Sequence, residues 1–493
     1  MKIFLKKLLS GKVMVLVAIS LFVTTSCTED FLDVPPQGEQ PGEEFWVSAD
    51  DAAKAVNAMY ANLRGWTQVA FAAIAVESLG SDNTEKGSSP SDATFLNTFD
   101  NYTATATEGQ TQEFWTGQYQ SINLANQVLD NIPPIQMDEN LKQRYLGEAK
   151  FVRAYAYFRL VRAFGGVPLR LHVPEDASEY NLARATREEV YAAIETDLTE
   201  AAAVLPQSYT GVDVGRATKG AALALHAKVA MYQAKWQDVL NLTNEVMGLG
   251  YSLHPDFEQL FRISNENSSE SVFEIQAAVI PGNPAASNSQ YSQVQGVRGS
   301  VGGGWGFNTP TGDLAAAFEP EDPRRDATII FRGETTPQGD AIPATGDNPM
   351  YNQKSYVPFS QHVAGYTEGA EQNIRVIRYA DVLLMNAEAN NELGNTAAAL
   401  ESLEMVRARA RGGNPDILPP VTTTDQAELR QAIWHERRVE LAMEYDRYFD
   451  VIRQGRGEEV FGPLGWEAHN EVWPIPQTEI NLSAGILEQN PGY

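Results

Sequence analysis

The sequence predicts a mainly α-helical protein, in which helical hairpins of the tetratricopeptide (TPR) type form a scaffold that long irregular loops interrupt. The clearest hairpin is the segment 374–410, where apolar residues recur at helical spacing up to Leu393. Gly394 then breaks this period, because glycine takes a positive φ at low cost just after a helix end. Thr396 can cap a second helix that carries its own apolar stripe. Such a hairpin cannot bury its apolar face alone and needs stacked neighbours.

Two further observations support this fold class. The segment 225–247 follows the same plan without a gap, with Ala227 in the place that Ala387 takes in the first hairpin. Between residues 251 and 373 the helical period almost vanishes, and residues 281–313 contain eight glycines, which exclude a regular helix there. A compact protein seldom keeps a loop of this length unless the loop serves function. Two ordinary helical hairpins of similar composition are the alternative to TPR-like packing.

The remaining elements follow in order along the chain. Apolar spacing and glycine or proline stops predict helices at 50–63, 112–131, 139–164, 187–205 and 426–453. Residues 66–79 are apolar and are expected to pack beneath the first helix, and residues 271–280 alternate as a strand does. The turn-rich segment 80–110 is expected to be loop. Residues 472–476 and 490–493 form an extended tail that we expect to lie over the helices.

The N-terminal segment has the pattern of a bacterial lipoprotein signal. A basic head precedes the apolar run 13–23, which is too short to cross a membrane. Cys27, the single cysteine of the chain, follows small residues as in a lipobox, so we expect a signal peptide at 1–26 and diacylglycerol on the Cys27 thiol. Residues 27–44 then form the lipidated N-terminus and a tether rich in proline and glycine. An ordinary secretory signal with an incidental cysteine is the alternative. One thiol excludes an internal disulfide and a multi-cysteine metal site.

The charge balance limits the possible partners. The chain has 64 acidic and 37 basic side chains, which give a formal net charge of −27 at pH 7. A charge of this sign and size argues against nucleic acid and against anionic lipid as binding partners. It indicates a well-solvated surface and does not identify a ligand.

Six places in the chain carry a family resemblance. They are the lipobox, AKFVRAYAYFRLVRAFGGVPL from Ala149, GWGFNTPTGDLAAAFEPEDPRRDATI from Gly304, RYADVLLMNAEANNELGN from Arg378, ERRVELAMEYDRYFDVIRQG from Glu436, and VWPIPQTEI with the final QNPGY. In this order they cover essentially the whole mature chain, which resembles the SusD/RagB family of nutrient-binding outer-membrane lipoproteins. The chain departs from that family at Tyr445-Asp446, where Gly-His is usual, and at 482–485, where an asparagine-proline turn is usual.

The resemblance implies about four TPR-like helix pairs in a domain spanning 45–493, with ligand loops mainly in 80–110 and 251–373. It implies a non-catalytic lipoprotein on the outer membrane. Glu29 and Asp30 follow the cysteine, and in lipoproteins that this N-terminus resembles, acids in this place help export to the outer face of that membrane. Such a protein would capture an oligo- or polysaccharide and deliver it to a TonB-dependent, SusC-like transporter. A surface enzyme that degrades glycans and a periplasmic TPR scaffold remain as alternatives.

The sequence offers little support for catalysis. Its six histidines have no metal-ligand spacing, and no nucleophile elbow or phosphate-binding loop occurs. Glu440 and Glu444 lie one helical turn apart and are the best pair for glycosidase chemistry. Arg437, Arg438 and Arg447 are close in sequence, so an ion-pair network that keeps both carboxylates ionised is the favoured interpretation. We therefore predict no enzymatic activity, no cofactor and no metal.

Sugar binding requires aromatic rings beside short polar side chains, because the C–H faces of a pyranose are weakly apolar whereas its hydroxyls form hydrogen bonds. Two loops mix these types. The candidate ligand contacts are Asp82, Asn83, Phe95, Phe99, Asn101 and Tyr102 in the first loop, and Tyr291 and Trp305 in the second. Trp305 stands between two glycines that leave its ring unobstructed, although a structural role is an open alternative. Trp66 is expected to belong to the core, because apolar residues follow it.

Overall fold

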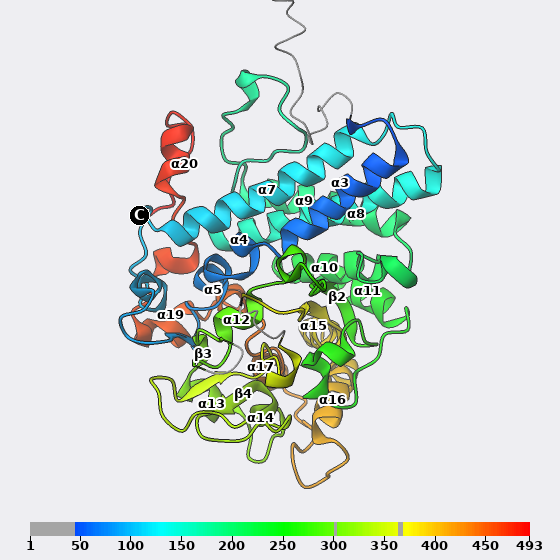
Figure 1. Cartoon of the computed structure of the whole chain (residues 1–493). Coiled ribbons are helices and arrows are strands. Elements are labelled where there is room, and N and C mark those ends of the chain that lie inside the picture. The colour runs from blue at the N-terminus through cyan, green and yellow to red at the C-terminus, as the bar shows by residue number, and fades with distance from the viewer. Residues whose placement is uncertain (1–44, 300–302, 363–367) are drawn as a thin grey trace, which may run out of the picture.

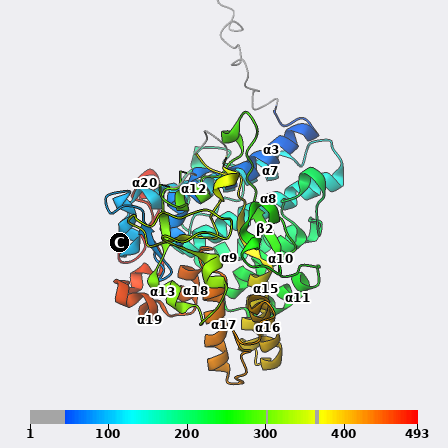
Figure 2. The same ribbon diagram turned by 60° about the horizontal axis from the view of Figure 1, so that its bottom comes forward.

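Helices that follow one another in the chain lie side by side and form the scaffold, as Figure 1 shows. The computed structural model describes residues 45–299, 303–362 and 368–493, so the predicted signal peptide, Cys27 and the tether lie outside the described residues. The scaffold helices are α3 (Ala49–Leu63), α7 (Gly109–Asn131), α8 (Glu139–Phe164), α9 (Arg187–Val204), α10 (Lys219–Met231), α11 (Trp236–Met247), α15 (Tyr379–Glu392), α16 (Thr396–Arg411) and α17 (Gln426–Glu440). Both views place α3 and α16 at opposite ends of this stack (Figures 1 and 2). The predicted fold class is confirmed.

Shorter elements fill the space beside the scaffold. The short helices are α4 (Trp66–Val69), α5 (Phe71–Glu77), α6 (Asn97–Asp100), α12 (Tyr291–Gln295), α13 (Gly312–Ala317), α14 (Arg324–Thr328), α18 (Arg447–Arg453), α19 (Gly457–Phe461) and α20 (Gln477–Leu482). The strands are β1 (Thr84–Gly87), β2 (Ser271–Ile275), β3 (Phe307–Pro310), β4 (Ile329–Phe331), β5 (Met350–Asn352) and β6 (Ile374–Arg378). They form antiparallel pairs, β1 with β3, β2 with β6 and β4 with β5.

Local sequence signals explain where the scaffold helices begin and end. The Ser48 hydroxyl accepts a hydrogen bond from the Asp51 amide at 3.2 Å, and the Asp51 carboxylate accepts one from the Ser48 amide at 3.1 Å, which makes a capping box for α3. Asp138 caps α8 through the Leu141 amide at 2.8 Å. The same helix ends at Gly165, whose φ of +74° favours glycine. These boundaries agree with those expected from the sequence.

The hairpin at 374–410 differs in detail from its prediction. Its first five residues form β6, which pairs with β2 and places Ile275 opposite Ile374. The first helix therefore starts at Tyr379, and the segment 276–373 leaves and rejoins the scaffold at two paired residues. Asn395, not Thr396, occupies the N-cap position of α16. The expected turn is confirmed, because Gly394 has φ +79°.

The expected helix at 426–453 is interrupted. α17 stops at Glu440 and α18 starts at Arg447, because Met443 and Tyr445 both take φ +67°, which ends a right-handed helix. Tyr445 thus adopts the backbone conformation of glycine at a position where glycine is usual in the resembling family. The tail at 472–476 is extended and lies on α8, since the Trp473 amide donates to the Ala163 carbonyl at 2.7 Å. The helix α20 within the tail, and β1 and α6 within the expected loop 80–110, were not predicted.

Candidate ligand-binding site

Four aromatic rings meet on the surface beside the scaffold. Trp66 and Phe71 begin α4 and α5, Phe95 lies in a turn before α6, and Trp305 precedes β3. Phe71 is central, with its ring centroid 5.4 Å from that of Trp66, 5.9 Å from Phe95 and 5.9 Å from Trp305. The rings of Trp66 and Trp305 are 6.0 Å apart. Phe95 is 42% exposed and the other three are half-buried. We call these four residues the platform.

The backbone around Trp305 fixes the position of its ring. The Trp305 amide donates to the Gln293 carbonyl at 2.9 Å. Gly306 has φ +74°, and a Cβ there would approach Asn348 Nδ2 to 2.6 Å, so only glycine fits without a shift. Behind the platform, the buried ring of Phe307 packs edge-on against Phe71 with a centroid distance of 4.8 Å. The central ring of the platform, Phe71, therefore rests on a buried aromatic residue of β3.

Arg298 joins the two loops that carry Phe95 and Trp305. Its Nη1 donates to Asp92 Oδ2 at 2.9 Å and to the Trp305 carbonyl at 3.0 Å, and it also contacts the Ser88 hydroxyl. The pairing of β1 with β3 connects the same two loops through their backbones. Residues more than two hundred positions apart in the chain therefore form one surface.

Polar groups border the platform. Glu113 of α7 is half-buried, and burial raises the pKa of its carboxyl above the usual value, while a hydrogen bond with Trp66 opposes that rise. The carboxylate of Asp92 and the guanidinium of Arg298 are each about 40% exposed. The arrangement offers apolar ring faces and adjacent hydrogen-bonding groups, which is the combination that a sugar requires.

Three of the predicted aromatic contacts lie in the core instead. Phe99 is 0% exposed, Tyr102 is 5% exposed and Tyr291 is 7% exposed. The Tyr102 hydroxyl donates to the Gly80 carbonyl, and Tyr291 packs edge-on against Tyr445 at a centroid distance of 6.2 Å. Burial raises the pKa of Tyr291. These rings are covered by protein, so they leave the set of candidate direct contacts, whereas Phe95 and Trp305 remain in it.

The predicted polar contacts are occupied by other protein groups. Asp82 accepts two hydrogen bonds from Arg447, at 2.7 and 2.8 Å. Burial would raise the pKa of Asp82, but Arg447 and Arg438 hold it below its usual value. Asn83 is 1% exposed and accepts from Arg438 at 2.9 Å. Asp82 and Asn83 thus fasten their loop to α17 and α18. Asn101 is exposed and accepts from the Thr103 hydroxyl at 2.5 Å.

The platform also contains two residues that sequence reasoning did not place there. Trp66 was expected in the core, and Phe71 was part of an apolar run that was expected to be buried. Both pack against the core but are only half-buried. The spacing of Trp66 and Phe71 could not show that they belong to an aromatic cluster, because the third ring, Trp305, comes from a distant loop.

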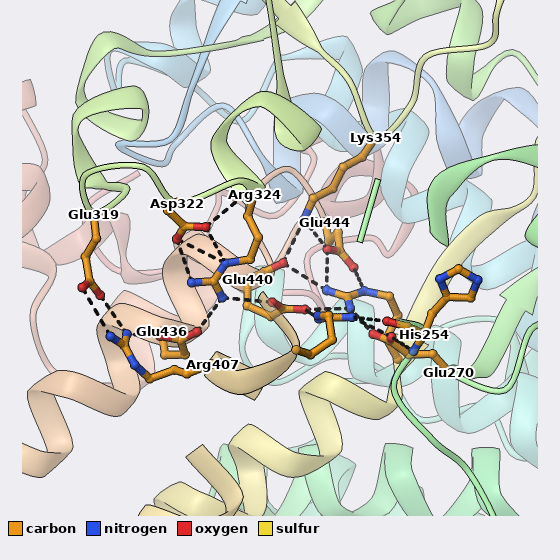
Figure 3. A network of polar contacts seen from close by, with 12 residues as sticks. His254, Glu270, Glu319, Asp322, Arg324, Lys354, Arg407, Glu436, Glu440 and Glu444 are labelled. Atoms are coloured by element: carbon orange, nitrogen blue, oxygen red, sulfur yellow. Dashed lines mark hydrogen bonds and ion pairs between the residues drawn. The ribbon is translucent and has the colours of Figure 1, made fainter. Parts of the chain in front are cut away.

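Glu440 and Glu444 belong to a buried ionic network, which Figure 3 shows. Glu440 accepts hydrogen bonds from Arg378 at 3.0 Å, from Arg324 at 3.1 Å and from Arg409. Glu444 accepts from Lys354 at 2.6 Å and from Arg378 at 2.7 Å. Burial would raise the pKa of each carboxyl, but these cations lower both. The network is present as expected, and both groups are ionised, which does not suit a general acid.

The partners within that network differ from the expected ones. Arg437 pairs with Asp381 at 2.8 Å and with Asp450 at 3.2 Å, and not with Glu440 or Glu444. Arg438 and Arg447 pair with Asp82. The cations that hold Glu440 and Glu444 come instead from β6, α14, α16 and the segment after β5, which no sequence spacing on α17 could indicate.

Residues 45–299, 303–362 and 368–493 contain no group of three or more histidine, cysteine, aspartate or glutamate side chains that could hold a metal ion. Within the same ranges, the helices are too short or too polar to cross a membrane.

Comparisons with known proteins agree with this architecture. Residues 30–231 match a family described as "Starch-binding associating with outer membrane", and residues 269–493 match one described as "SusD family". SusD-like protein P2 of Formosa agariphila is 28% identical, with 96% of this chain and 98% of that protein covered. A solved laminarin-binding SusD-like protein is 31% identical with a TM-score of 0.79, covering 91% of this chain and 100% of that one. A SusD-like protein from Bacteroides fragilis is 26% identical, with a TM-score of 0.78 and coverages of 93% and 100%.

Proposed function

This chain belongs to the SusD/RagB family, and from that premise we propose that it binds an oligo- or polysaccharide on the platform without cutting it. The observation that carries the proposal is the cluster of the partly exposed rings of Trp66, Phe71, Phe95 and Trp305 with polar groups at its edge. The buried ion pairs of Glu440 and Glu444 support the absence of catalysis, because neither carboxylate can readily take up a proton.

The ligand class that fits the platform best is a neutral glucan. A relative that is 31% identical over 91% of this chain is described as laminarin-binding. Aromatic rings suit the apolar faces of glucose units, and at the edge Asp92 and Arg298 are already paired with each other. Laminarin is therefore the first ligand to test.

The remaining parts of the function concern location and delivery. We infer that Cys27 is lipidated, that the tether 27–44 holds the domain on the outer face of the outer membrane, and that the bound glycan passes to a SusC-like, TonB-dependent transporter. The family description, which names association with the outer membrane, supports the location. A tether makes transfer to a partner in the same membrane effectively intramolecular, so modest glycan affinity would suffice.

Isothermal titration with laminarin tests the platform. Phe95→Ala and Trp305→Ala should each weaken binding about 10- to 100-fold, which corresponds to roughly 1.4–2.8 kcal/mol. Phe331→Ala, which removes a half-buried ring of β4 outside the platform, is the matched control and should leave affinity unchanged. Equal affinity for all variants would refute the platform as the binding site.

Three further measurements separate the alternatives. Laminarin incubated with the protein should show no new products by chromatography, whereas product formation would favour a surface enzyme. External protease should remove the domain from intact cells, and protection would favour a periplasmic scaffold. Membranes solubilised in mild detergent should release the protein together with a large β-barrel partner, and recovery of the protein alone would contradict delivery to a transporter.

A further inference from the structure

A cleft of about 780 Å³ lies along a different face of α7 from the platform. On α7, Thr116, Gln120 and Asn123 line this cleft, and their spacing of four and three residues puts them on one helical face. Gly117 marks the side of α7 that faces the platform, because its carbonyl accepts a hydrogen bond from Nε2 of Gln68 in α4 at 2.5 Å. The volume lies in the range of small-molecule binding sites. The cleft is thus large enough to bind a ligand of its own.

One wall of the cleft is the segment 168–182, and side chains of α7 and α8 hold the backbone of its first part, 168–171, in place. Tyr119 donates to the Pro168 carbonyl at 2.7 Å, Asn126 to the Arg170 carbonyl at 3.0 Å, and Arg153 to the Leu171 carbonyl at 2.7 Å. Arg153 is itself paired with Asp197 at 2.7 Å. A wall fixed in this way loses little conformational entropy when a ligand binds.

The opposite boundary comes from α20. Glu479 accepts from Gln112 of α7 at 2.7 Å, which ties α20 to the floor of the cleft. Figure 1 shows α20 beside the same end of α7. Leu482 of α20 is 69% exposed and Tyr180 of the other wall is 59% exposed, and both border the cleft. The opening of the cleft therefore carries one large, exposed side chain on each side.

The polar groups of the cleft indicate which ligand it suits. The exposed side chains of Gln120, Asn123 and Asn181 border it, and none of these three side chains makes a hydrogen bond to a residue in the described ranges. The charged groups are engaged: Arg170 donates to the Glu179 carbonyl at 2.9 Å, and Glu479 accepts from Gln112. Uncharged amides beside Tyr119 and Tyr180 match a ligand with many hydroxyls and weakly apolar faces, not an ionic one. The described elements around the cleft include no strand edge, which an extended peptide would need for backbone pairing.

We propose that this cleft is a second binding site, for a neutral oligosaccharide, that works separately from the platform. Both sites flank α7, so a polysaccharide long enough to reach both would bind more tightly than either site allows alone, because the second contact is intramolecular. A short oligosaccharide would gain nothing from the second site.

The test uses the mature chain on an array of neutral oligosaccharides that includes laminarin fragments. In the Phe95→Ala/Trp305→Ala background the platform is disabled, and some array binding should persist. Adding Asn123→Ala and Tyr180→Ala should reduce that residual binding at least tenfold. All of these side chains are exposed or half-buried, so the variants should remain folded, which circular dichroism checks.

Gln237→Ala, on an exposed position of α11, is the matched control and should leave the residual binding unchanged. The proposal is overturned if the platform variant binds nothing on the array, or if its residual binding survives the cleft substitutions. Loss of all binding on disabling the platform would leave the proposed function standing and remove only the second site. If the unaltered chain binds no glycan on the array, both proposals fail.

Discussion

Arg324 gives the sharpest test of how the loop segment 276–373 is fastened to the scaffold. Its side chain is fully buried and contacts three carboxylates (Figure 3). Its Nη1 lies 2.5 Å from Glu436 and 3.1 Å from Glu440, and its Nη2 lies 2.8 Å from Asp322. We consider Arg324→Met, which keeps most of the side-chain length but removes the charge.

The expected cost follows from what each carboxylate loses. Glu436 keeps Arg407 at 2.8 Å, and Glu440 keeps Arg378 and Arg409. Asp322 has no other cationic partner among the described residues and is 5% exposed. Breaking a buried pair and leaving one charge without its partner costs about 3–5 kcal/mol. We therefore expect Arg324→Met to lower the free energy of unfolding by about that amount.

Urea unfolding followed by tryptophan fluorescence at pH 7 measures this change. The neighbouring Arg325 is the matched control, because it is 50% exposed and pairs with Asp326, which is 70% exposed. Arg325→Met should cost less than about 1 kcal/mol. The double variant Asp322→Asn/Arg324→Met should recover part of the loss, since it removes the unpaired carboxylate as well.

The result that would refute this reasoning is equal stability of the Arg324→Met and Arg325→Met proteins. That outcome would mean that the ion pairs of the buried guanidinium stabilise the fold by no more than the desolvation of this group destabilises it. A double variant that is less stable than Arg324→Met would contradict the assignment of the cost to Asp322.

Three other predictions follow from burial, charge and the N-terminal sequence. Burial lowers the pKa of Lys354 to about 8, below the value of about 10.4 in an unfolded chain. Between these pH values the unfolded chain binds one proton more than the folded chain, so the free energy of unfolding should rise with pH across this window. Urea titrations measure this rise, and Lys354→Met should abolish it. Tyr291→Ala should lower the free energy of unfolding by about 3–5 kcal/mol, because the Tyr291 ring is buried. Phe95→Ala should lower it far less, because the Phe95 ring is 42% exposed. Similar melting temperatures for the two variants would contradict the division between core and platform. Cys27→Ser should move the protein from the membrane fraction to an uncleaved or soluble form, since a lipidated cysteine with several acyl chains is needed for stable anchoring, and an unchanged membrane fraction would exclude this anchor.

Local sequence signals were sufficient for most of the helical scaffold. The bounds of α8 agree with the expected ones because Asp138 and Gly165 mark its two ends by their own chemistry. The strand β6 was missed for the opposite reason. Its apolar residues at 374, 376 and 377 fit a helix or a strand. Its partner β2 lies about a hundred residues earlier, so the strand conformation of 374–378 depends on a pairing that local sequence does not show.

The candidate site was predicted less well, because burial in loops depends on distant residues. Phe95 and Phe99 stand four positions apart in one polar segment, yet one is 42% exposed and the other 0%. Phe99 is buried because Trp473, from the C-terminal tail, packs on it at a centroid distance of 5.2 Å. Trp66 was assigned to the core because its contact with Trp305 cannot be inferred from either neighbourhood. Composition indicated two candidate loops but could not indicate which of their rings are buried.

The pairing of Ile275 with Ile374 has a consequence for how such proteins can diversify. Opposed residues of antiparallel strands lie about 5 Å apart at their Cα atoms, so the two ends of the intervening segment 276–373 join the scaffold at neighbouring points. Each doubling of a flexible segment's length costs only about 0.6 kcal/mol in closure entropy. A different segment can therefore replace 276–373 between β2 and β6 without displacing a scaffold helix, provided that it carries equivalents of Asp322 and Arg324 that pair with α17. Such an exchange would replace Trp305, while Trp66, Phe71 and Phe95, which lie outside the segment, and the helical body stay the same.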